Sequence, residues 1–498
     1  MKKINNIWKY ILASTFIIYL GACSNQDTDE LETLIDIANI SRATAVEAEI
    51  KDLSAGGLDA ALEAKVGSEN KYKVTKLKLA GNFNAKDVMT LRKLTSLEDL
   101  DMGGIMIVQE EEWEANRYEF QAILWNNNRN ENIGEYLTEN TIGTYMFAGM
   151  TALKNVVLPN SVTYINHAAL MNCTSLEKVV LPVDLEGLSS YVFRKNNLET
   201  LTIPASLKEA DDYFISDNPR LKAVFWESSA KVPAYDNYNL ESLLLYVLNE
   251  DVIVSSSWQN VIANGVAESI SIKAKDPWYG KDDVYSFNAP RAFTAKKISY
   301  TRYFDNWTSI GQACGWETIV LPFVPTSITH ETKGTIAPFN SGISDAKPFW
   351  LRSLTANGFV DVTTMEANVP YIIAMPNTDS YIEEYRLNGW VTFSGENVVV
   401  PETVYQPEAV KGPEFSLQPS YEFISESKYI YTLNVRDGMG YNYGSSFVRG
   451  GGDVRAFEAY AVLEGRSVSR VIDLDCSSSN TRSAGMMNKT GVPQIGDM

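Results

Sequence analysis

The middle of the chain repeats one pattern of hydrophobic and polar positions. Each copy has a leucine, two variable residues, an aliphatic residue, a variable residue and then an aliphatic or aromatic residue, and the copies occupy 151–159, 174–182, 196–204 and 218–226. Their first leucines lie 23, 22 and 23 residues apart, at Leu153, Leu176, Leu198 and Leu221. A fixed period in the low twenties predicts a solenoid, because no single turn of this kind can bury its apolar face without stacking on its neighbours.

The segments between these strands carry a second pattern. Ile142 to Phe147 reads IGTYMF, Val162 to Cys173 reads VTYINHAALMNC, and a proline closes each strand at Pro159, Pro182 and Pro204. Together with the L-x-x-L-x-L core, these segments resemble the repeats of BspA-like leucine-rich-repeat surface proteins, which are common as lipoproteins in Bacteroides-type bacteria.

Two departures from that family pattern bear on the fold. Leu170 stands where the family usually has Phe, and the stretch from Leu185 to Leu188 is irregular. We therefore expect the third turn of the solenoid to be distorted.

Before the repeat, the pattern predicts a helical cap. The stretch from Leu31 to Lys65 contains helical spacing, with Leu58, Ala61, Leu62 and Val66 on one face after the break at Gly56-Gly57. Val74 to Leu79 alternates as a strand does, and Asp87 to Leu94 is typical of a helix. Leu97 begins a further repeat strand 56 residues before Leu153, which is one period plus an insertion of about 33 residues. The family resemblance implies a cap here, and an uncovered end strand would otherwise invite aggregation.

After Trp226 the period changes. One more candidate repeat strand is LESLLL at 240–245, and 251–290 is expected to end the solenoid. Beyond it, short alternating segments separated by Gly, Pro and Asn predict an antiparallel β-sandwich-like domain. The expected strands are 293–304, 317–324, 358–363, 370–375, 390–400, 429–435, 456–463 and 468–475.

The N-terminus has the features of a lipoprotein signal peptide. A short basic start is followed by the apolar stretch from Tyr10 to Leu20, which is too short to span a membrane and ends in Leu-Gly-Ala before Cys23. This lipobox implies cleavage before Cys23 and lipidation of that residue, which would give a stable membrane anchor. The acidic run from Ser24 to Glu30 resembles the surface-export signal of Bacteroides-type lipoproteins, so we expect an outer-membrane protein at the cell surface.

The fold class predicted from these patterns is mixed and β-dominated, with a leucine-rich-repeat solenoid, an N-terminal helical cap and a following antiparallel β-sandwich-like domain. The predicted segments are 1–22 signal peptide, 23–45 tether, 46–104 cap and first repeat, 105–140 insertion, 141–250 repeats, 251–290 solenoid end, 291–475 β domain and 476–498 disordered tail.

The net charge and the number of histidines and cysteines exclude some classes of function. A net charge of −19 opposes binding to nucleic acid, because that affinity comes from Lys and Arg. We predict no metal site, no cofactor and no catalytic centre, since the sequence has only two histidines and no C-x-x-C motif. Cys173 occupies the small buried position of the repeat. A disulfide between Cys314 and Cys476 stays open, and the many carboxylates leave a glycosidase-like pair without support but not excluded.

The outward positions of the repeat strands predict an interaction surface. Read along the chain, the first column is Asp99, Asn155, Lys178, Thr200, Ala223 and Ser242, and the second is Asp101, Val157, Val180, Thr202, Phe225 and Leu244. The second column is unexpectedly apolar, and contiguous exposed apolar surface marks interaction sites. We therefore predict partner contacts at Val157, Val180, Thr202, Phe225 and Leu244, and at Trp113 and Trp125 of the insertion. The alternative is that these tryptophans or the β domain fold over the column and cover it.

The sequence leaves two functional hypotheses, and a third, a mainly architectural spacer on the cell surface, which it does not separate from the first. The first is a non-enzymatic cell-surface lipoprotein whose solenoid binds a protein or mediates adhesion. The second is a glycan-handling accessory protein or enzyme that uses the β domain. In either case the expected partners are the membrane, through the lipid anchor, and a protein or glycan ligand.

Overall fold

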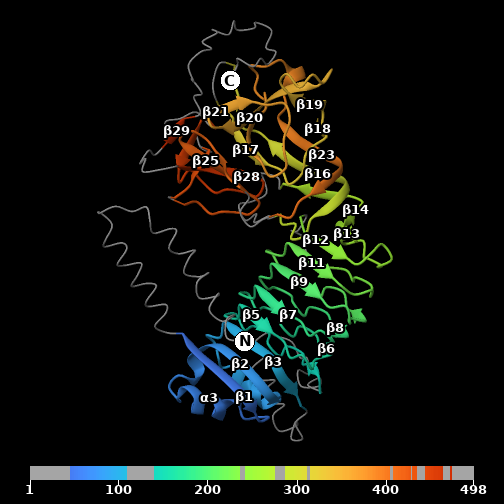
Figure 1. The fold of residues 1–498 in the computed structure, drawn as a ribbon, viewed down its shortest axis with the longest axis vertical. Helices are drawn as coiled ribbons and strands as arrows, with labels where there is room; N and C mark the ends of the chain where they lie inside the picture. The colour runs from blue at the N-terminus through green and yellow to red at the C-terminus, as the bar shows by residue number, and fades with distance from the viewer. Residues whose placement is uncertain are drawn as a thin grey trace, which may run out of the picture.

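The computed structural model describes residues 45–108, 139–235, 242–274, 287–310, 314–403, 408–427, 429–433, 444–463 and 471–473. Figure 1 shows an elongated molecule in which a column of stacked turns joins an N-terminal segment at one end to a C-terminal β region at the other. In these residue ranges, no helix has both the length and the apolar character needed to cross a bilayer.

The N-terminal segment begins the first sheet of the solenoid. Strands β1 to β3 pair in parallel, and two helices connect them. The elements are β1 (Val46–Leu53), α3 (Leu58–Val66), η1 (Lys71–Lys73), β2 (Val74–Phe83), α4 (Ala85–Leu91) and β3 (Asp99–Ile107). The buried carboxylate of Asp87 joins the two helices, because it accepts hydrogen bonds from the backbone N–H groups of Gly56 (2.7 Å) and Leu58 (2.8 Å). The helical spacing of Leu58, Ala61, Leu62 and Val66 lies in α3, as predicted, whereas residues 46–53 of the same stretch form the strand β1.

The repeats build two parallel sheets that face each other. The first sheet runs β1-β2-β3-β5-β7 and the second runs β10-β8-β6-β4. The strands are β4 (Thr141–Ile142), β5 (Asn155–Val157), β6 (Tyr164–Ile165), β7 (Lys178–Val180), β8 (Gly187–Leu188), β9 (Thr200–Ile203), β10 (Glu209–Ala210), β11 (Ala223–Trp226), β12 (Leu244–Val247) and β13 (Asn260–Ala263). β9 continues the stack beyond β7, where the Asn197 N–H donates to the carbonyl of Leu176 at 3.0 Å.

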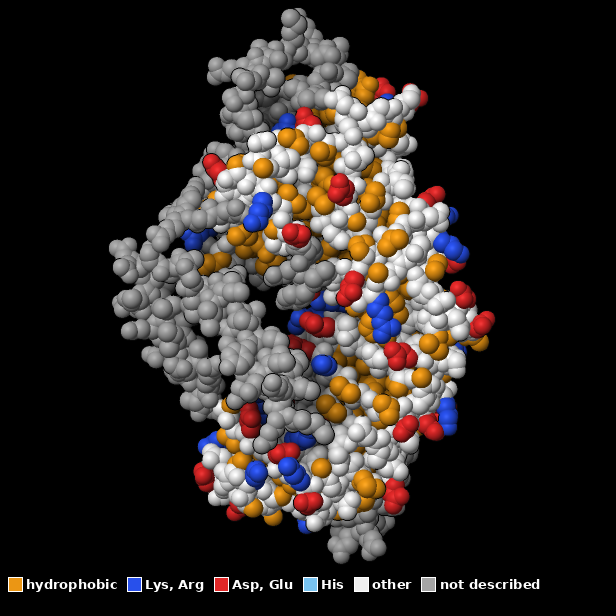
Figure 2. All heavy atoms as spheres, in the orientation of Figure 1, with side chains coloured by type: hydrophobic (Ala, Val, Ile, Leu, Met, Phe, Trp, Pro, Cys, Tyr) orange, Lys and Arg blue, Asp and Glu red, His pale blue; other side chains and the backbone are white. Residues whose placement is uncertain are grey.

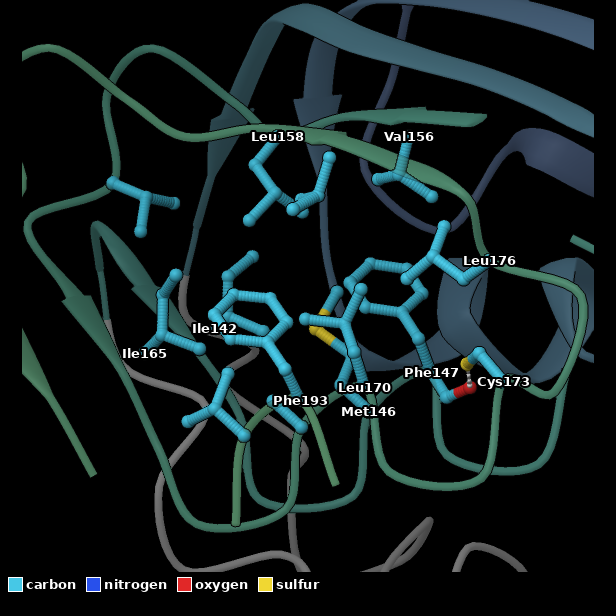
Figure 3. Close-up of a cluster of buried hydrophobic side chains, with 14 of the residues drawn as sticks. Ile142, Met146, Phe147, Val156, Leu158, Ile165, Leu170, Cys173, Leu176 and Phe193 are labelled. Atoms are coloured by element: carbon cyan, nitrogen blue, oxygen red, sulfur yellow. Dashed lines mark hydrogen bonds between the residues drawn. The ribbon is translucent and has the colours of Figure 1, made fainter. Parts of the chain in front are cut away.

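The solenoid core lies between these sheets (Figure 3). The leucines that open each repeat are no more than 2% exposed. Leu170 fills the same layer as Phe147 and Phe193, so the smaller side chain is accommodated at the family's Phe position. The Cys173 thiol donates to the carbonyl oxygen of Phe147 at 3.2 Å.

The third turn is regular, so the predicted distortion is wrong. β8 pairs in parallel with both β6 and β10, and Leu185 and Leu188 are buried. Gly187 makes this pairing possible, because a Cβ at that position would lie 2.1 Å from the ring of Tyr164.

The last turns of the solenoid continue into the C-terminal region through one hydrogen-bonded sheet. β11, β12 and β13 are parallel, and β13 turns back into β14 (Val266–Ala267) through Asn264 and Gly265. Both turn residues have positive φ (46° and 77°), as a tight two-residue hairpin requires. β14 and β15 (Ile270–Lys273) then pair with β16 (Phe293–Phe304), so the solenoid sheet has no free edge at this end.

The C-terminal region adds further strands to this sheet and a second sheet of its own. In the 14-stranded sheet the order is β17-β22-β20-β19-β18-β23-β16-β14-β13-β12-β11-β9, with β15 beside β16 and β21 beside β20. Its remaining elements are β17 (Glu317–Val320), β18 (Ser327–His330), β19 (Gly334–Pro338), β20 (Lys347–Thr355), β21 (Gly358–Asp361), β22 (Pro370–Ala374), η3 (Glu383–Tyr385) and β23 (Gly389–Val400). The pairs β14–β16, β15–β16 and β19–β20 are parallel, so the expectation of a purely antiparallel region is wrong there.

The second C-terminal sheet has the order β24-β25-β28-β26-β27-β29. It consists of β24 (Val410–Lys411), β25 (Phe415–Ser420), β26 (Tyr431–Leu433), β27 (Ser446–Arg449), β28 (Glu458–Leu463) and β29 (Val471–Asp473). An apolar cluster joins the two sheets, with Trp350 and Ile372 from the large sheet and Leu417 and Phe447 from the small one.

Candidate docking surface

The outward face of the solenoid consists of the side chains on β1, β2, β3, β5, β7, β9, β11 and β12 that point away from its core. The strand register aligns Asp101 with Val157, Val157 with Val180, and Thr202 with Phe225. Neighbouring strands in a sheet lie about 4.8 Å apart, so such side chains form continuous columns across the sheet. The outward face divides into three parts according to what surrounds it.

At the N-terminal end the outward face is a ladder of opposite charges. Lys76 Nζ lies 3.4 Å from Glu47 Oε1 and 3.9 Å from Asp99 Oδ2, and Lys78 Nζ lies 3.0 Å from Asp101 Oδ2. Cross-strand pairs of this kind stabilise a sheet modestly and hold its register. The hydrogen bond to the Asp101 carboxylate raises the pKa of Lys78.

In the middle, aliphatic side chains replace the charges. Val157 is half-buried, Val180 is 43% exposed, and Thr202 is exposed. Val157 and Val180 line a shallow groove of about 700 Å³ that extends over β1, β2, β3, β5 and β7, whereas Thr202 on β9 lies outside it. Its charged lining residues are four carboxylates and four ammonium groups: Glu47, Glu49, Asp99, Asp101, Lys65, Lys76, Lys78 and Lys178.

At the C-terminal end the outward face is covered by the C-terminal region. Phe225 is 8% exposed, its ring stacks on Tyr246 with centroids 5.0 Å apart, and the Arg291 guanidinium lies 4.1 Å from its ring centre. The Tyr246 hydroxyl donates to the Arg291 carbonyl at 2.9 Å, and burial raises the pKa of Tyr246. Lys222, which is also buried, pairs with Glu422.

The structure corrects two of the predicted contact residues. Phe225 and Leu244 are packed into the core of the C-terminal region and cannot reach a partner. Leu244 is also misplaced by two residues, because it aligns with Ala223 while Tyr246 aligns with Phe225. The alternative that the β domain covers the column therefore holds for the last two turns. Trp113, Trp125 and Cys23 lie outside the described residues.

The sequence pattern does not predict that Tyr246 belongs to the outward column, and the reason is the run of leucines before it. In LESLLL several leucines can each start the L-x-x-L frame, and the structure places Ser242, not Leu240, at the position equivalent to Leu221. Ser242 is buried at that position. The aromatic residue two positions after Leu244 was the available signal, because Tyr246 repeats the aromatic of Phe225.

The cysteines and the histidine that could take part in catalysis outside the outward face are buried in the described structure. Burial raises the pKa of the Cys173 thiol to about 12, which removes it as a nucleophile at neutral pH. His330 Nε2 lies 3.0 Å from the Asn388 carbonyl, and burial lowers the pKa of its ring. Cys314 is buried, and because Cys476 lies outside the described residues the question of a bond between them stays open.

Two neighbouring carboxylates do occur, but they share one guanidinium. Arg302 Nη2 on β16 lies 2.5 Å from Glu317 Oε2 on β17 and 3.1 Å from Glu458 Oε1 on β28. Burial raises the pKa of Glu317 to about 7, and repulsion by Glu458 acts in the same direction while Arg302 opposes it. The trio links strands of both C-terminal sheets, which is a structural role. Among the described residues, no group of three or more His, Cys, Asp or Glu is placed to hold a metal ion.

A family model matches the solenoid. The model of the "BspA type Leucine rich repeat region" matches residues 139–251 in six copies. No protein with a curated description matches the chain. Two solved structures are similar over part of it: the pneumococcal vaccine antigen PcpA (17% identity, TM-score 0.21, covering 38% of this chain and 59% of that one) and a leucine-rich repeat protein from Bacteroides ovatus (18% identity, TM-score 0.20, covering 39% and 56%).

The chain thus spans less than two thirds of the length of either solved protein. The match to the repeat model, the period of the leucines and the two parallel sheets agree on one family. Residues 139–251 of this chain are a BspA-type leucine-rich repeat region.

Proposed function

We propose that this protein is a cell-surface lipoprotein whose solenoid binds a protein partner on the open part of its outward face. Leucine-rich repeats generally mediate protein binding, and extended solenoid surfaces suit that role. The observation that carries the proposal is the contrast along one column. Val180 is 43% exposed beside a groove, whereas Phe225 is 8% exposed under the C-terminal region.

The anchor is tested by replacing the residue that would be lipidated. Cys23→Ala should move the protein from the membrane fraction to the soluble fraction, because Leu20-Gly21-Ala22 would no longer precede a thiol that can be acylated. Fractionation with a salt wash measures the change. A variant that still pellets with membranes and resists the wash would contradict the lipoprotein proposal.

The docking surface is tested with purified extracellular-matrix proteins and mucin as immobilised probes. Val157→Asp together with Val180→Asp should abolish capture of the probe that the native protein binds, because contacts near the centre of an interface carry most of its energy. The matched control is Val183→Asp, an equal change at a 70% exposed valine that does not line the groove. Capture that survives the double variant would place the binding surface elsewhere.

A further inference from the structure

Lys178 differs from the two other strand lysines of the groove in its ionic environment. Lys76 and Lys78 have carboxylate oxygens within 3.4 Å and 3.0 Å. Lys178 has no carboxylate within 4 Å among the described residues, and its register partner is the neutral Asn155. The Asn155 amide is itself occupied, because it donates to Asp99 Oδ1 at 2.6 Å. Among the strand lysines of the groove, Lys178 is therefore the one without a carboxylate partner in the described part of the chain; Lys65, which also has none there, lies on α3 and not on the sheet.

An apolar site lies next to this cation. Val180 follows Lys178 by two residues on β7, so both side chains point outward, and Val180 pairs in register with Val157 on β5. Two residues of an extended strand span about 6.6 Å. The Lys178 ammonium and the valine pair thus form two adjacent subsites, one ionic and one aliphatic.

We propose that the partner, within the docking function proposed above, is an extended protein segment that carries a carboxylate and an aliphatic side chain two residues apart. Such a segment has the same spacing of about 6.6 Å as Lys178 and Val180. Its carboxylate pairs with the Lys178 ammonium, and its aliphatic side chain covers Val157 and Val180. Charge complementarity of this kind supplies specificity and orientation, while the aliphatic contact removes apolar surface from water.

The charge of the surroundings favours a single carboxylate over a polyanion. The groove lining has equal numbers of carboxylates and ammonium groups, and the whole chain has a net charge of −19. A polyanionic chain would meet Asp99, Asp101 and the acidic surface beyond the groove, whereas one carboxylate placed at Lys178 avoids them.

The test uses short glycine-serine peptides with a central Glu-Thr-Val, displayed densely on a biosensor so that avidity makes weak binding measurable. The matched probes carry Gln-Thr-Val, Lys-Thr-Val or Glu-Thr-Ser, and heparin is the polyanion probe. The full-length protein and its Lys178→Glu variant are compared, with Lys231→Glu, an exposed lysine outside the groove, as the control.

We expect the native protein and the Lys231→Glu control to prefer Glu-Thr-Val over the other peptides by at least about tenfold. Lys178→Glu should lose that preference and gain binding to Lys-Thr-Val. Equal binding of Glu-Thr-Val and Gln-Thr-Val, or an unchanged preference in Lys178→Glu, would overturn the proposal. Capture of heparin that depends on Lys178 would replace the protein segment with an anionic polysaccharide.

The two proposals fail in different ways. If matrix-protein capture depends on Val157 and Val180 while no peptide binds, the docking function stands and the acidic-aliphatic partner is wrong. If neither the proteins nor the peptides bind through these residues, both proposals fall.

Discussion

The outward face of the solenoid is exposed to solvent in one part and buried in another. On β5 and β7 it meets solvent, with Val180 43% exposed, and on β11 and β12 it becomes part of the core of the C-terminal region, with Phe225 8% exposed. The two residues hold equivalent positions in their repeats. The difference teaches that the repeat determines which side chains point inward, whereas the rest of the chain decides what happens to those that point outward.

Contacts with distant residues make the covered end. Arg291 packs on Phe225, and Glu422 pairs with the buried Lys222. Because the sheet also continues from β13 into β14 and β16, the last turns and the C-terminal region share a core and a hydrogen-bonded sheet. The first turns have no such cover among the described residues, so their outward face keeps its ion pairs and its groove.

The largest effect is expected at the covered end. Phe225→Asp should lower the free energy of unfolding by about 4 kcal/mol or more, because it removes a buried aromatic ring and places a charge in an apolar site. Thr202→Asp is the matched control, since Thr202 is exposed and is the register partner of Phe225 on β9. Urea unfolding followed by circular dichroism measures both variants. Similar midpoints for the two would mean that Phe225 is open to solvent.

The sequence predicts the two regions unequally. The period of the leucines is enough to predict the inner positions, because every turn repeats the same packing problem; Leu153, Leu176 and Leu198 are all fully buried. The cover on this end comes from Arg291, about 65 positions after Phe225, and from Glu422, which pairs with Lys222 across 200 positions. No local pattern encodes that contact, so the column of outward residues appears uniform in the sequence when it is not.

The second largest effect is expected between inward and outward positions of one strand, whose truncation should cost different amounts of unfolding free energy. Leu176→Ala should cost about 2 to 5 kcal/mol, since Leu176 is fully buried and its truncation leaves a cavity. Lys178→Ala should change the free energy of unfolding by less than about 0.5 kcal/mol, because its side chain is exposed. Thermal and urea unfolding of the two variants provide the measurement, and comparable losses would show that the strand register is wrong.

A smaller effect is expected in the C-terminal region, where the ionisation of Glu317 should make the stability depend on pH. The pKa of Glu317 is raised from 4.5 to about 7 in the folded protein. Between these values the folded state holds a proton that the unfolded state has released, so this group's contribution to stability is lost as the pH rises from 4.5 to 7. The loss is about 3 kcal/mol at most.

Glu317→Gln isolates that contribution, because the amide cannot titrate. The stability of the native protein relative to this variant should be higher at pH 5 than at pH 8, as measured by urea unfolding at each pH. The comparison with the variant removes the general effect of the chain's acidic charge. A difference that stays constant over this range would show that Glu317 titrates near its ordinary value.

Register is the second limit of sequence reasoning. Val157, Val180 and Thr202 lie in the predicted column, because each follows a single unambiguous L-x-x-L frame. Leu244 does not, because four leucines within 240–245 allow competing frames that differ by a few residues. Some C-terminal strands could not be predicted from the sequence either. β20 is nine residues long, yet its sequence KPFWLRSLT lacks the alternation of apolar and polar residues that marks a strand.

The smallest effect is expected in the open part of the outward face. Val180→Asp should change the free energy of unfolding by no more than about 0.5 kcal/mol, because Val180 is 43% exposed and loses little buried area. The new carboxylate would also lie two residues from Lys178 on the same face, in reach of an unneutralised ammonium group. Thermal unfolding in low and high salt is the measurement, since screening would weaken any such pair. A marked loss of stability at both salt concentrations would mean that Val180 is covered within the chain, and the contrast with Phe225 would disappear.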